Sequence, residues 1–254
     1  MSKRKTTSVL FGTILFSIFA FANLLNGVCV AQIAAPQIET FDGKSIASLD
    51  AWNVISGNWQ VQGDSLVVDS FDADAYITFG DPAWQNYEVE ASVSLLQARD
   101  PSRWLSVLVR ATRNGDKPWS QVAMRSDTTK PNGVEFSVRT PANGWSVRGK
   151  ASAPAACNRN TRHLKVVVRG SRIEGFLDGQ LVISSQLCVD RPNGCVGLGA
   201  SGCVAAFDDV SVRHLPASTD PPVAPTIQCD IVAHRGFSAI APENTLAAIR
   251  QGTD

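Results

Sequence analysis

The sequence predicts a mainly β protein: an antiparallel two-sheet sandwich of jelly-roll type over residues 36–215, followed by one strand and one helix of an α/β unit over 227–254. Short segments alternate apolar and polar residues with the period of two that is typical of half-buried strands, as at 59–62, 65–68, 87–93, 104–109, 134–138, 164–168 and 204–212. Asn-Gly or Asp-Gly pairs indicate hairpin turns at 114–115, 132–133, 143–144, 178–179 and 193–194. No convincing amphipathic helix interrupts this pattern, and about a dozen short strands suit two stacked sheets.

The N-terminus has the features of a secretory signal in the usual order. A basic run at 3–5 precedes an apolar segment at 9–25, and the small residue Ala31 follows. This order predicts a signal peptide over 1–31, cleaved before Gln32. An uncleaved membrane anchor is the alternative, because the apolar segment is just long enough to approach a span. In both cases we expect export, to the periplasm, the cell envelope or the exterior.

Composition argues against one class of partner. The chain has 254 residues and is 44% hydrophobic, which is enough to bury a substantial core. Its 23 basic and 23 acidic residues give zero net charge, and the basic residues are scattered along the chain. Bulk electrostatics therefore gives no case for nucleic-acid binding.

The cysteines that remain after signal removal are odd in number: Cys157, Cys188, Cys195, Cys203 and Cys229. In an oxidising compartment, pairing would leave one of them over. Cys195 and Cys203 flank a glycine-rich run and are candidates to face each other across a hairpin, although spacing alone does not fix the register. Metal binding is the weaker alternative, because the chain has no Cys-x-x-Cys pair.

Three parts of the predicted sandwich carry distinctive turn and core residues. They are the opening at 41–66, with Phe41-Asp-Gly and Trp59, the hairpin at 175–182, and the closing strands at 197–212. In these positions the sequence resembles the concanavalin A-like, laminin G-like sandwich domains of secreted bacterial proteins. The resemblance implies a fold far more than a function.

All six tryptophans lie in the predicted sandwich. Sugar-binding sandwiches stack sugar rings on exposed aromatic side chains, and Trp119 and Trp145 stand beside turn residues, where exposure is expected. These two are therefore candidate carbohydrate-binding residues, with a glycan as the partner. Trp52, Trp59 and Trp104 are expected in the core, and local packing of Trp119 and Trp145 is the alternative.

The carboxylates of the sandwich give weaker signals. Asp208 and Asp209 would point to opposite faces of a strand, which argues against a calcium site. Glu88 and Glu90 share a face at i and i+2, but a solvated polar face explains them as well as a hydrolase would.

A second unit is predicted after a proline-rich linker at 216–226, which has four prolines in eleven residues. Residues 227–233 are mostly apolar and predict a strand buried on both faces, and 242–251 predict a helix. In a (β/α)8 barrel, residues at the C-terminal ends of the strands point into the active site.

The loop between that strand and helix contains His234-Arg235-Gly236 and then Pro242-Glu243-Asn244-Thr245. This pattern resembles the opening of the catalytic domain of the glycerophosphodiester phosphodiesterase family. The resemblance implies a TIM-type barrel, of which 227–254 would be a truncated start. It also implies hydrolysis of glycerophosphodiesters to glycerol 3-phosphate and an alcohol, with a divalent metal such as Mg²⁺ or Ca²⁺.

By this resemblance, His234 would act in acid–base catalysis and Arg235 would hold the phosphate. Gly236 would allow close backbone approach. Glu243 and Asn244 would either complement the helix N-terminus or support the catalytic loop. The family's metal carboxylates and second histidine are absent from this chain, so we expect it to lack diesterase activity by itself.

The sequence thus leaves two functions open. One is an exported phosphodiesterase, represented here by an accessory sandwich and the start of its barrel. The other is a secreted carbohydrate-binding or adhesion module without catalytic activity.

Overall fold

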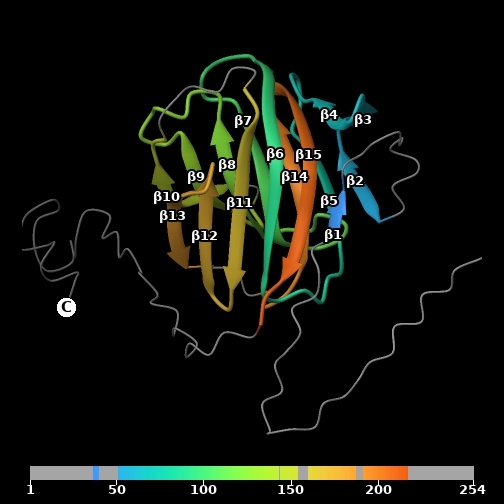
Figure 1. The fold of residues 1–254 in the computed structure, drawn as a ribbon, viewed down its shortest axis with the longest axis vertical. Helices are drawn as coiled ribbons and strands as arrows, with labels where there is room; N and C mark the ends of the chain where they lie inside the picture. Colours follow the sequence, from blue (N-terminus) through green and yellow to red (C-terminus); the bar gives the residue numbers. More distant parts are fainter. Residues whose placement is uncertain (1–36, 40–50, 143, 154–159, 187–190, 217–254) are drawn as a thin grey trace, which may run out of the picture. The chain divides into compact units, whose positions relative to one another are not determined.

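The computed structural model describes residues 37–39, 51–142, 144–153, 160–186 and 191–216. These ranges contain fifteen β-strands and no helix (Figure 1). The strands are β1 (Gln37–Glu39), β2 (Trp52–Ser56), β3 (Asn58–Gln62), β4 (Ser65–Asp69), β5 (Ala75–Phe79), β6 (Tyr87–Ala98), β7 (Trp104–Ala111), β8 (Trp119–Arg125), β9 (Val134–Arg139), β10 (Trp145–Ala151), β11 (Arg162–Arg169), β12 (Arg172–Leu177), β13 (Gln180–Gln186), β14 (Cys195–Ser201) and β15 (Cys203–His214).

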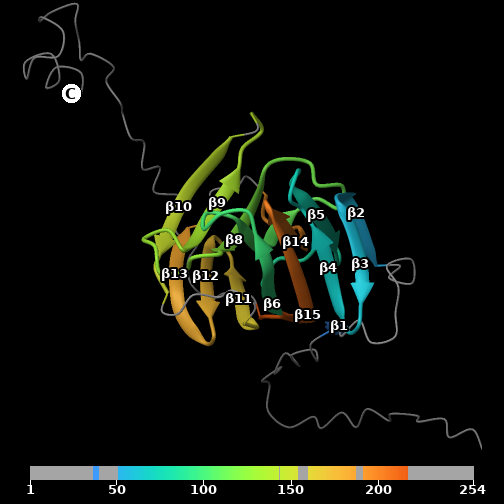
Figure 2. The same cartoon turned by 90° about the horizontal axis from the view of Figure 1, so that it is seen from above.

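The strands form two stacked antiparallel sheets (Figure 2). One sheet has eight strands in the order β13-β12-β11-β6-β15-β4-β3, with β1 also paired to β15. The other has seven strands in the order β10-β9-β8-β7-β14-β5-β2. Spatial neighbours such as β6 and β15 are far apart in sequence, as a jelly-roll sandwich requires. The predicted antiparallel two-sheet sandwich is confirmed.

The core lies between the sheets because apolar residues occupy alternate positions along the strands. On β15, Phe207 is 0% exposed, and its ring centroid lies 5.9 Å from that of Trp59 on β3. Trp59 is thus a core residue, as predicted. On β6 the buried side chains that face the other sheet follow the same period: Tyr87, Val89, Ala91, Val93 and Leu95.

The turn between β12 and β13 shows how a dipeptide sets a hairpin. Asp178 and Gly179 have φ values of 50° and 78°, and a type I′ turn needs positive φ at both central positions. Leu177 and Gln180 then pair directly across the turn. The hairpin predicted from Asp178-Gly179 is therefore confirmed.

Cys195 and Cys203, the candidates to face each other across a hairpin, do not do so. Cys195 begins β14 in the seven-stranded sheet, Cys203 begins β15 in the eight-stranded sheet, and both are free and buried. The chain crosses between sheets after β14 instead of turning back as a hairpin. The length of an extended strand therefore separates the two thiols, roughly 20 Å for such a segment. The other cysteines lie outside the described residues.

The predicted second unit, 227–254, lies outside the described residues, as do the predicted signal 1–31 and all of the linker after Pro216. Within the described residues the fold class is a two-sheet β-sandwich, and the predicted start of a TIM-type barrel falls outside them. Within these ranges, no helix has the length and apolarity needed to cross a membrane.

The buried side chain of Tyr87, at the start of β6, is expected to make the protein less stable at alkaline pH. Its side chain is 0% exposed, and its hydroxyl accepts a hydrogen bond from the Arg110 amide at 3.0 Å. Burial raises the pKa of Tyr87 from 10.0 to about 12, so the folded protein keeps this phenol neutral where the unfolded chain ionises. The stability it contributes is therefore complete below about pH 10 and decreases by about 1 kcal/mol per pH unit up to about pH 12.

Urea unfolding across this pH range measures the loss. A Tyr87→Phe variant is expected to be less stable near neutral pH, because the Arg110 amide loses its acceptor, yet to show a shallower decline at alkaline pH. Equal declines in the two proteins would contradict the assignment.

Candidate functional site

The residues predicted to carry phosphodiester chemistry, His234, Arg235, Gly236, Glu243 and Asn244, lie outside the described residues. In the part of the chain that the structure describes, no group of three or more His, Cys, Asp or Glu side chains is placed to hold a metal ion. The described residues offer two broad surfaces instead, the outward faces of the two sheets.

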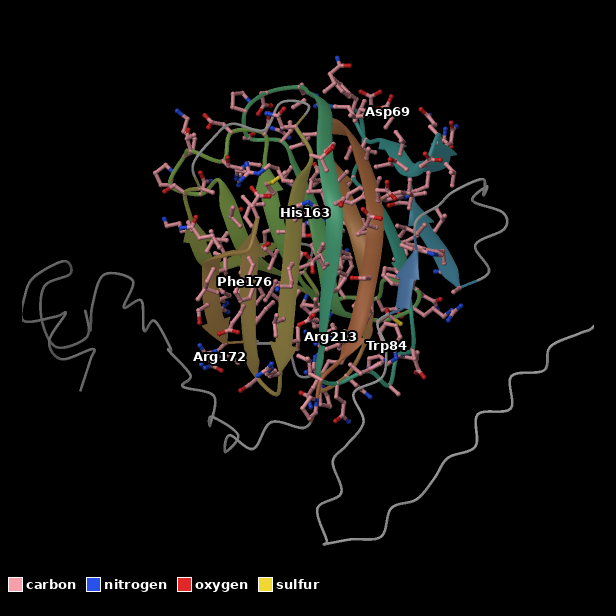
Figure 3. All side chains as sticks on the ribbon, in the orientation of Figure 1. Asp69, Trp84, His163, Arg172, Phe176 and Arg213 are labelled. Carbon is pink, nitrogen blue, oxygen red and sulfur yellow. The ribbon has the colours of Figure 1, made fainter. Side chains whose placement is uncertain are left out.

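The outward face of the eight-stranded sheet is mainly polar, with Phe176 and Leu181 as apolar exceptions (Figure 3). Arg213 forms an ion pair with Glu88 at 2.7 Å. Lys165 lies over the ring of Phe176, 5.0 Å from its centroid. Glu88 and Glu90 share this face, as predicted. Local partners of this kind are ordinary for a solvated surface and do not indicate a ligand.

A β-bulge changes the predicted arrangement of Asp208 and Asp209. The pairing of β15 with β6 shifts after Asp208, and Asp209 has a φ of 48°. Phe207 and Val210, on either side, both point into the core, so both carboxylates lie on the outward face and not on opposite faces. Asp209 accepts a hydrogen bond from the Ser92 hydroxyl at 3.2 Å, and Asp208 accepts one from the Asp209 amide at 2.8 Å. Each carboxylate thus already accepts a hydrogen bond from the protein.

The outward face of the seven-stranded sheet is aromatic. Tyr76, Trp104, Trp119 and Trp145 lie there, on β5, β7, β8 and β10, because the alternate residues of the central strands face the core. Together with Arg139, the last residue of β9, these side chains form what we call the aromatic face. In Figure 2 the sheet is curved, with β10 and β2 at its ends higher than β8 and β14 in its middle, so the aromatic face is on the concave side.

The four rings form a chain of contacts. Trp145 meets Trp104 edge to face, with centroids 5.9 Å apart and ring planes at 83°. Trp104 lies 6.5 Å from Tyr76, and Tyr76 lies 5.2 Å from Trp119. Aromatic pairs at such separations contribute about 0.5–1.5 kcal/mol each beyond area burial. The rings therefore hold one another in fixed orientations.

Trp145 and Trp119, the two ends of this series of ring contacts, differ in exposure. Trp145 is 37% exposed, in line with the expectation for this residue, whereas Trp119 is 3% exposed. The expected exposure of Trp119 is not observed, because Tyr76 and Leu108 pack against it. Trp104 is half-buried on this face and is not a core residue between the sheets. The predicted carbohydrate-binding role of Trp119 and Trp145 stays a prediction.

Gly199 on β14 leaves room for the Tyr76 ring. A Cβ atom at Gly199 would lie 2.8 Å from the Ser106 hydroxyl oxygen and 2.9 Å from the Tyr76 ring. Both distances are shorter than a carbon can approach without movement of its neighbours. The Gly-Leu-Gly sequence of β14 therefore provides a flat floor on which an aromatic ring from β5 can lie.

Gly199→Ala is expected to destabilise the protein by about 1–3 kcal/mol, because the added methyl group displaces the packed Tyr76 ring. The midpoint of urea unfolding measures the effect. Gly149→Ala on β10 is the matched control, since its nearest contact would be an ordinary 3.5 Å. Equal midpoints for the two variants would show that the Tyr76 ring does not need the space over Gly199.

Polar groups lie among the rings. The Ser106 hydroxyl donates to the Gln121 side-chain oxygen at 3.2 Å, and both residues are buried. The Tyr76 hydroxyl donates to the Asp74 carboxylate at 3.2 Å. Burial, followed by the charge of Asp74, raises the pKa of Tyr76, and nearby Arg139 acts in the opposite direction. Tyr76 is therefore a neutral phenol at physiological pH.

Arg139 lies between two tryptophans. It pairs across the strands with Trp119 on β8 and with Trp145 on β10. Its guanidinium carbon is 4.8 Å from the centroid of the Trp145 ring. The Nε of Arg139 and the indole nitrogen of Trp119 are both buried without a hydrogen-bond partner among the described residues. The face thus holds more hydrogen-bond donors than its own acceptors satisfy.

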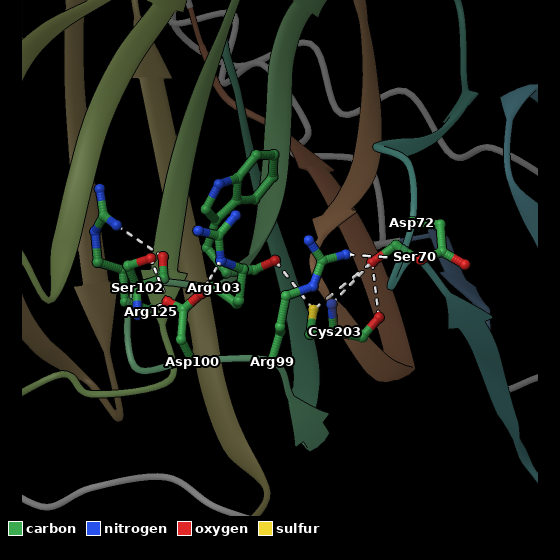
Figure 4. Close-up of polar contacts among 9 residues, drawn as sticks. Ser70, Asp72, Arg99, Asp100, Ser102, Arg103, Arg125 and Cys203 are labelled. Atoms are coloured by element: carbon green, nitrogen blue, oxygen red, sulfur yellow. Dashed lines mark hydrogen bonds and ion pairs between the residues drawn. The ribbon is translucent and has the colours of Figure 1, made fainter.

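The loop before β7 fixes the backbone at Trp104 (Figure 4). The Asp100 carboxylate accepts hydrogen bonds from the Ser102 amide at 2.8 Å and from Arg103 Nε at 2.7 Å. Hydrogen bonds from Ser102, then the contact with Arg103, lower the pKa of Asp100. The Cys203 thiol donates to the Trp104 carbonyl at 3.2 Å. These contacts fix the start of the strand that carries the Trp104 ring.

Comparison with known proteins gives structural matches only. No protein-family model and no curated protein matches the chain. The carbohydrate-binding module CBM66 from Bacillus subtilis superposes with a TM-score of 0.54 and 20% identity, over 64% of this chain and 94% of that one. The exoplasmic/lumenal domain of VIP36, in its Ca²⁺/Man2-bound form, gives 0.54 and 13%, over 73% and 90%. A Bacillus subtilis protein of unknown function with a galectin-like fold gives 0.52 and 10%, over 73% and 97%. These similarities show the fold.

The predicted membership of the glycerophosphodiester phosphodiesterase family is wrong. No family model matches the chain, and the solved structures that it resembles include a carbohydrate-binding module and a galectin-like domain. The hydrolase and lipid-metabolism roles and the glycerophosphodiester ligand lose their support with it. The pattern around His234 misled because proline and glutamate at the first turn are features of helix starts in general.

Proposed function

We propose that the sandwich is a carbohydrate-binding module and that the glycan lies on the aromatic face. The observation that carries this proposal is the Trp145 indole, 37% exposed and held at a fixed angle by Trp104. A sugar ring has apolar C–H faces that pack on an aromatic ring and hydroxyl groups that need hydrogen-bond partners. The aromatic face supplies an exposed ring with polar side chains close by.

The structural similarities support this choice of ligand. One similar structure is named a carbohydrate-binding module, and another is a domain in a Man2-bound form. Because the identities are 20% and 13%, the choice of the binding surface rests on the side chains of this chain and not on correspondence with those proteins.

We propose binding without hydrolysis. Glycoside hydrolysis by the usual route needs two carboxyl groups about 5–9.5 Å apart on either side of the scissile bond. Two carboxylates on this side of the sheet, Asp74 and Glu135, lie at the starts of β5 and β9, which β14, β7 and β8 separate. Four strand spacings of about 4.8 Å place them far beyond that range. Glu135 is also paired with Arg125 at 2.9 Å.

We further propose that the module acts outside the cytoplasm, either secreted or in the periplasm or cell envelope. The basic run, apolar segment and small residue of 1–31 support export. Extracellular and cell-wall polysaccharides would then be its accessible ligands.

A glycan array probed with the purified mature chain tests the proposal, and calorimetry with the strongest ligand provides the Kd. We expect a related group of glycans to bind with Kd values from about 1 μM to 1 mM. If no glycan retains the protein on the array, and no polysaccharide retards it in affinity electrophoresis, the proposal is overturned.

A further inference from the structure

Arg139 is a cation on the aromatic face that has no anionic partner. Among the described residues, no carboxylate lies within ion-pair distance of its guanidinium, and its Nε makes no hydrogen bond. Arg125, at the other end of β8, by contrast forms an ion pair with Glu135 at 2.9 Å and donates to the Ser102 carbonyl at 2.7 Å. Arg139 therefore keeps hydrogen-bonding capacity that the described chain does not use.

The position of Arg139 suits it to recognise a ligand. Its guanidinium carbon lies over the Trp145 ring, 4.8 Å from the centroid, and this cation–π contact restricts where the charge can move. No described residue accepts a hydrogen bond from its terminal N–H groups, so these stay available to a planar anion. Arg139 is half-buried. Its Nε is buried without a partner, whereas its terminal nitrogens are not among the buried atoms that have no partner. The charge is thus fixed, partly desolvated and next to the exposed indole.

The balance of charges around Arg139 also favours an anionic ligand. The chain as a whole has zero net charge. On the outward side of β8, β9 and β10, however, Arg125, Arg139 and Lys150 face a single carboxylate, Glu135. Glu135 pairs with Arg125 and lies opposite Lys150. The outward side of these three strands consequently carries a positive surplus that favours an anionic ligand.

We infer that the glycan bound by this face is acidic, and that Arg139 binds the carboxylate or sulfate of a sugar unit that packs against Trp145. The inference rests on the proposed function, because it names the class of glycan for the same site. The guanidinium donates two N–H groups to two oxygens of the anion, and the sugar ring that carries the anion packs on the adjacent indole.

Matched pairs of oligosaccharides test the inference. Oligogalacturonate is compared with its carboxyl-reduced form, sialyllactose with lactose, and a sulfated galactan oligosaccharide with its desulfated form, by calorimetry at low and high salt. We expect the wild-type chain to prefer the anionic member of at least one pair by about tenfold or more, and to lose most of this preference at high salt. The carboxylated and sulfated pairs show which anion is bound.

Arg139→Gln is expected to reduce that preference to about onefold while the affinity for the neutral member stays within about threefold. Arg172→Gln, on the outward face of the other sheet, is the matched control and is expected to preserve the preference. Equal affinities for both members of all pairs, or a preference that survives Arg139→Gln, would overturn the inference but leave the carbohydrate-binding proposal intact. Absence of binding to every member would overturn both.

Discussion

Replacement of Trp145 with alanine is expected to weaken glycan binding about 30-fold, because tryptophans at binding sites typically contribute about 2 kcal/mol when truncated. Trp145 is the exposed end of the ring chain on the aromatic face, 37% exposed and in contact with Trp104. Its loss removes the surface for the sugar and the ring on which Arg139 rests. Calorimetry with the best ligand from the array measures the change in Kd.

Phe176→Ala is the matched control for this prediction. Phe176 lies on the outward face of the other sheet, under Lys165, and its removal is expected to leave Kd within about twofold of wild type. Both variants should keep the unfolding free energy of the parent within about 1 kcal/mol, since neither ring belongs to the core between the sheets. Binding that survives Trp145→Ala but is lost in Phe176→Ala would place the glycan on the opposite face.

Phe207→Ala is expected to cost about 3–5 kcal/mol of unfolding free energy, the range typical of a large buried aromatic side chain. Phe207 is 0% exposed in the centre of the sandwich and packs against Trp59 at 5.9 Å. Truncation leaves a cavity that rigid sheets on both sides cannot close. Such a loss is a large fraction of the roughly 5–15 kcal/mol that stabilises a typical domain. The midpoint of urea unfolding, with the slope unchanged, reports it.

Val204→Ala on the same strand is the control. Val204 is half-buried and points outward, so its truncation is expected to cost less than about 1 kcal/mol. If the two substitutions cost the same, Phe207 would not lie in a rigid core, and the inward and outward assignment of β15 would be wrong.

The sandwich could be predicted because its signals are local. Alternation along a strand shows which side chains face inward, and a pair such as Asp178-Gly179 specifies a hairpin through its own backbone angles. Which of the two sheets a strand joins, by contrast, is not specified by its local sequence. The glycine-rich run between Cys195 and Cys203 looks like a hairpin in sequence, yet β14 and β15 belong to different sheets. Whether such a run forms a hairpin within one sheet or crosses to the other sheet depends on the order of the strands in space.

Strand order also explains the different outcomes for the two candidate tryptophans. Trp119 and Trp145 both lie on the aromatic face beside turns, but β8 has neighbours on both sides and β10 is an edge strand. Tyr76 therefore packs over Trp119, and Trp145 remains exposed.

Sequence reasoning missed Arg139, although a local signal for its direction is present. Phe136 and Val138 alternate along β9 and both face the core, so the next residue, Arg139, must point outward. What the sequence does not contain is the pairing of β9 with β8 and β10, which places this arginine between Trp119 and Trp145. The neighbours of a side chain across a sheet therefore had to come from the structure.

Nuclear magnetic resonance of the indole N–H signals gives the most direct test of whether the aromatic face binds glycans. The chain has six tryptophans, so each signal can be assigned by single substitution. On titration with the best ligand from the array, the signals of Trp145 and Trp104 are expected to shift most, and that of core Trp59 least. Indole signals of Trp145 and Trp104 that stay unmoved while the ligand binds would contradict the proposal.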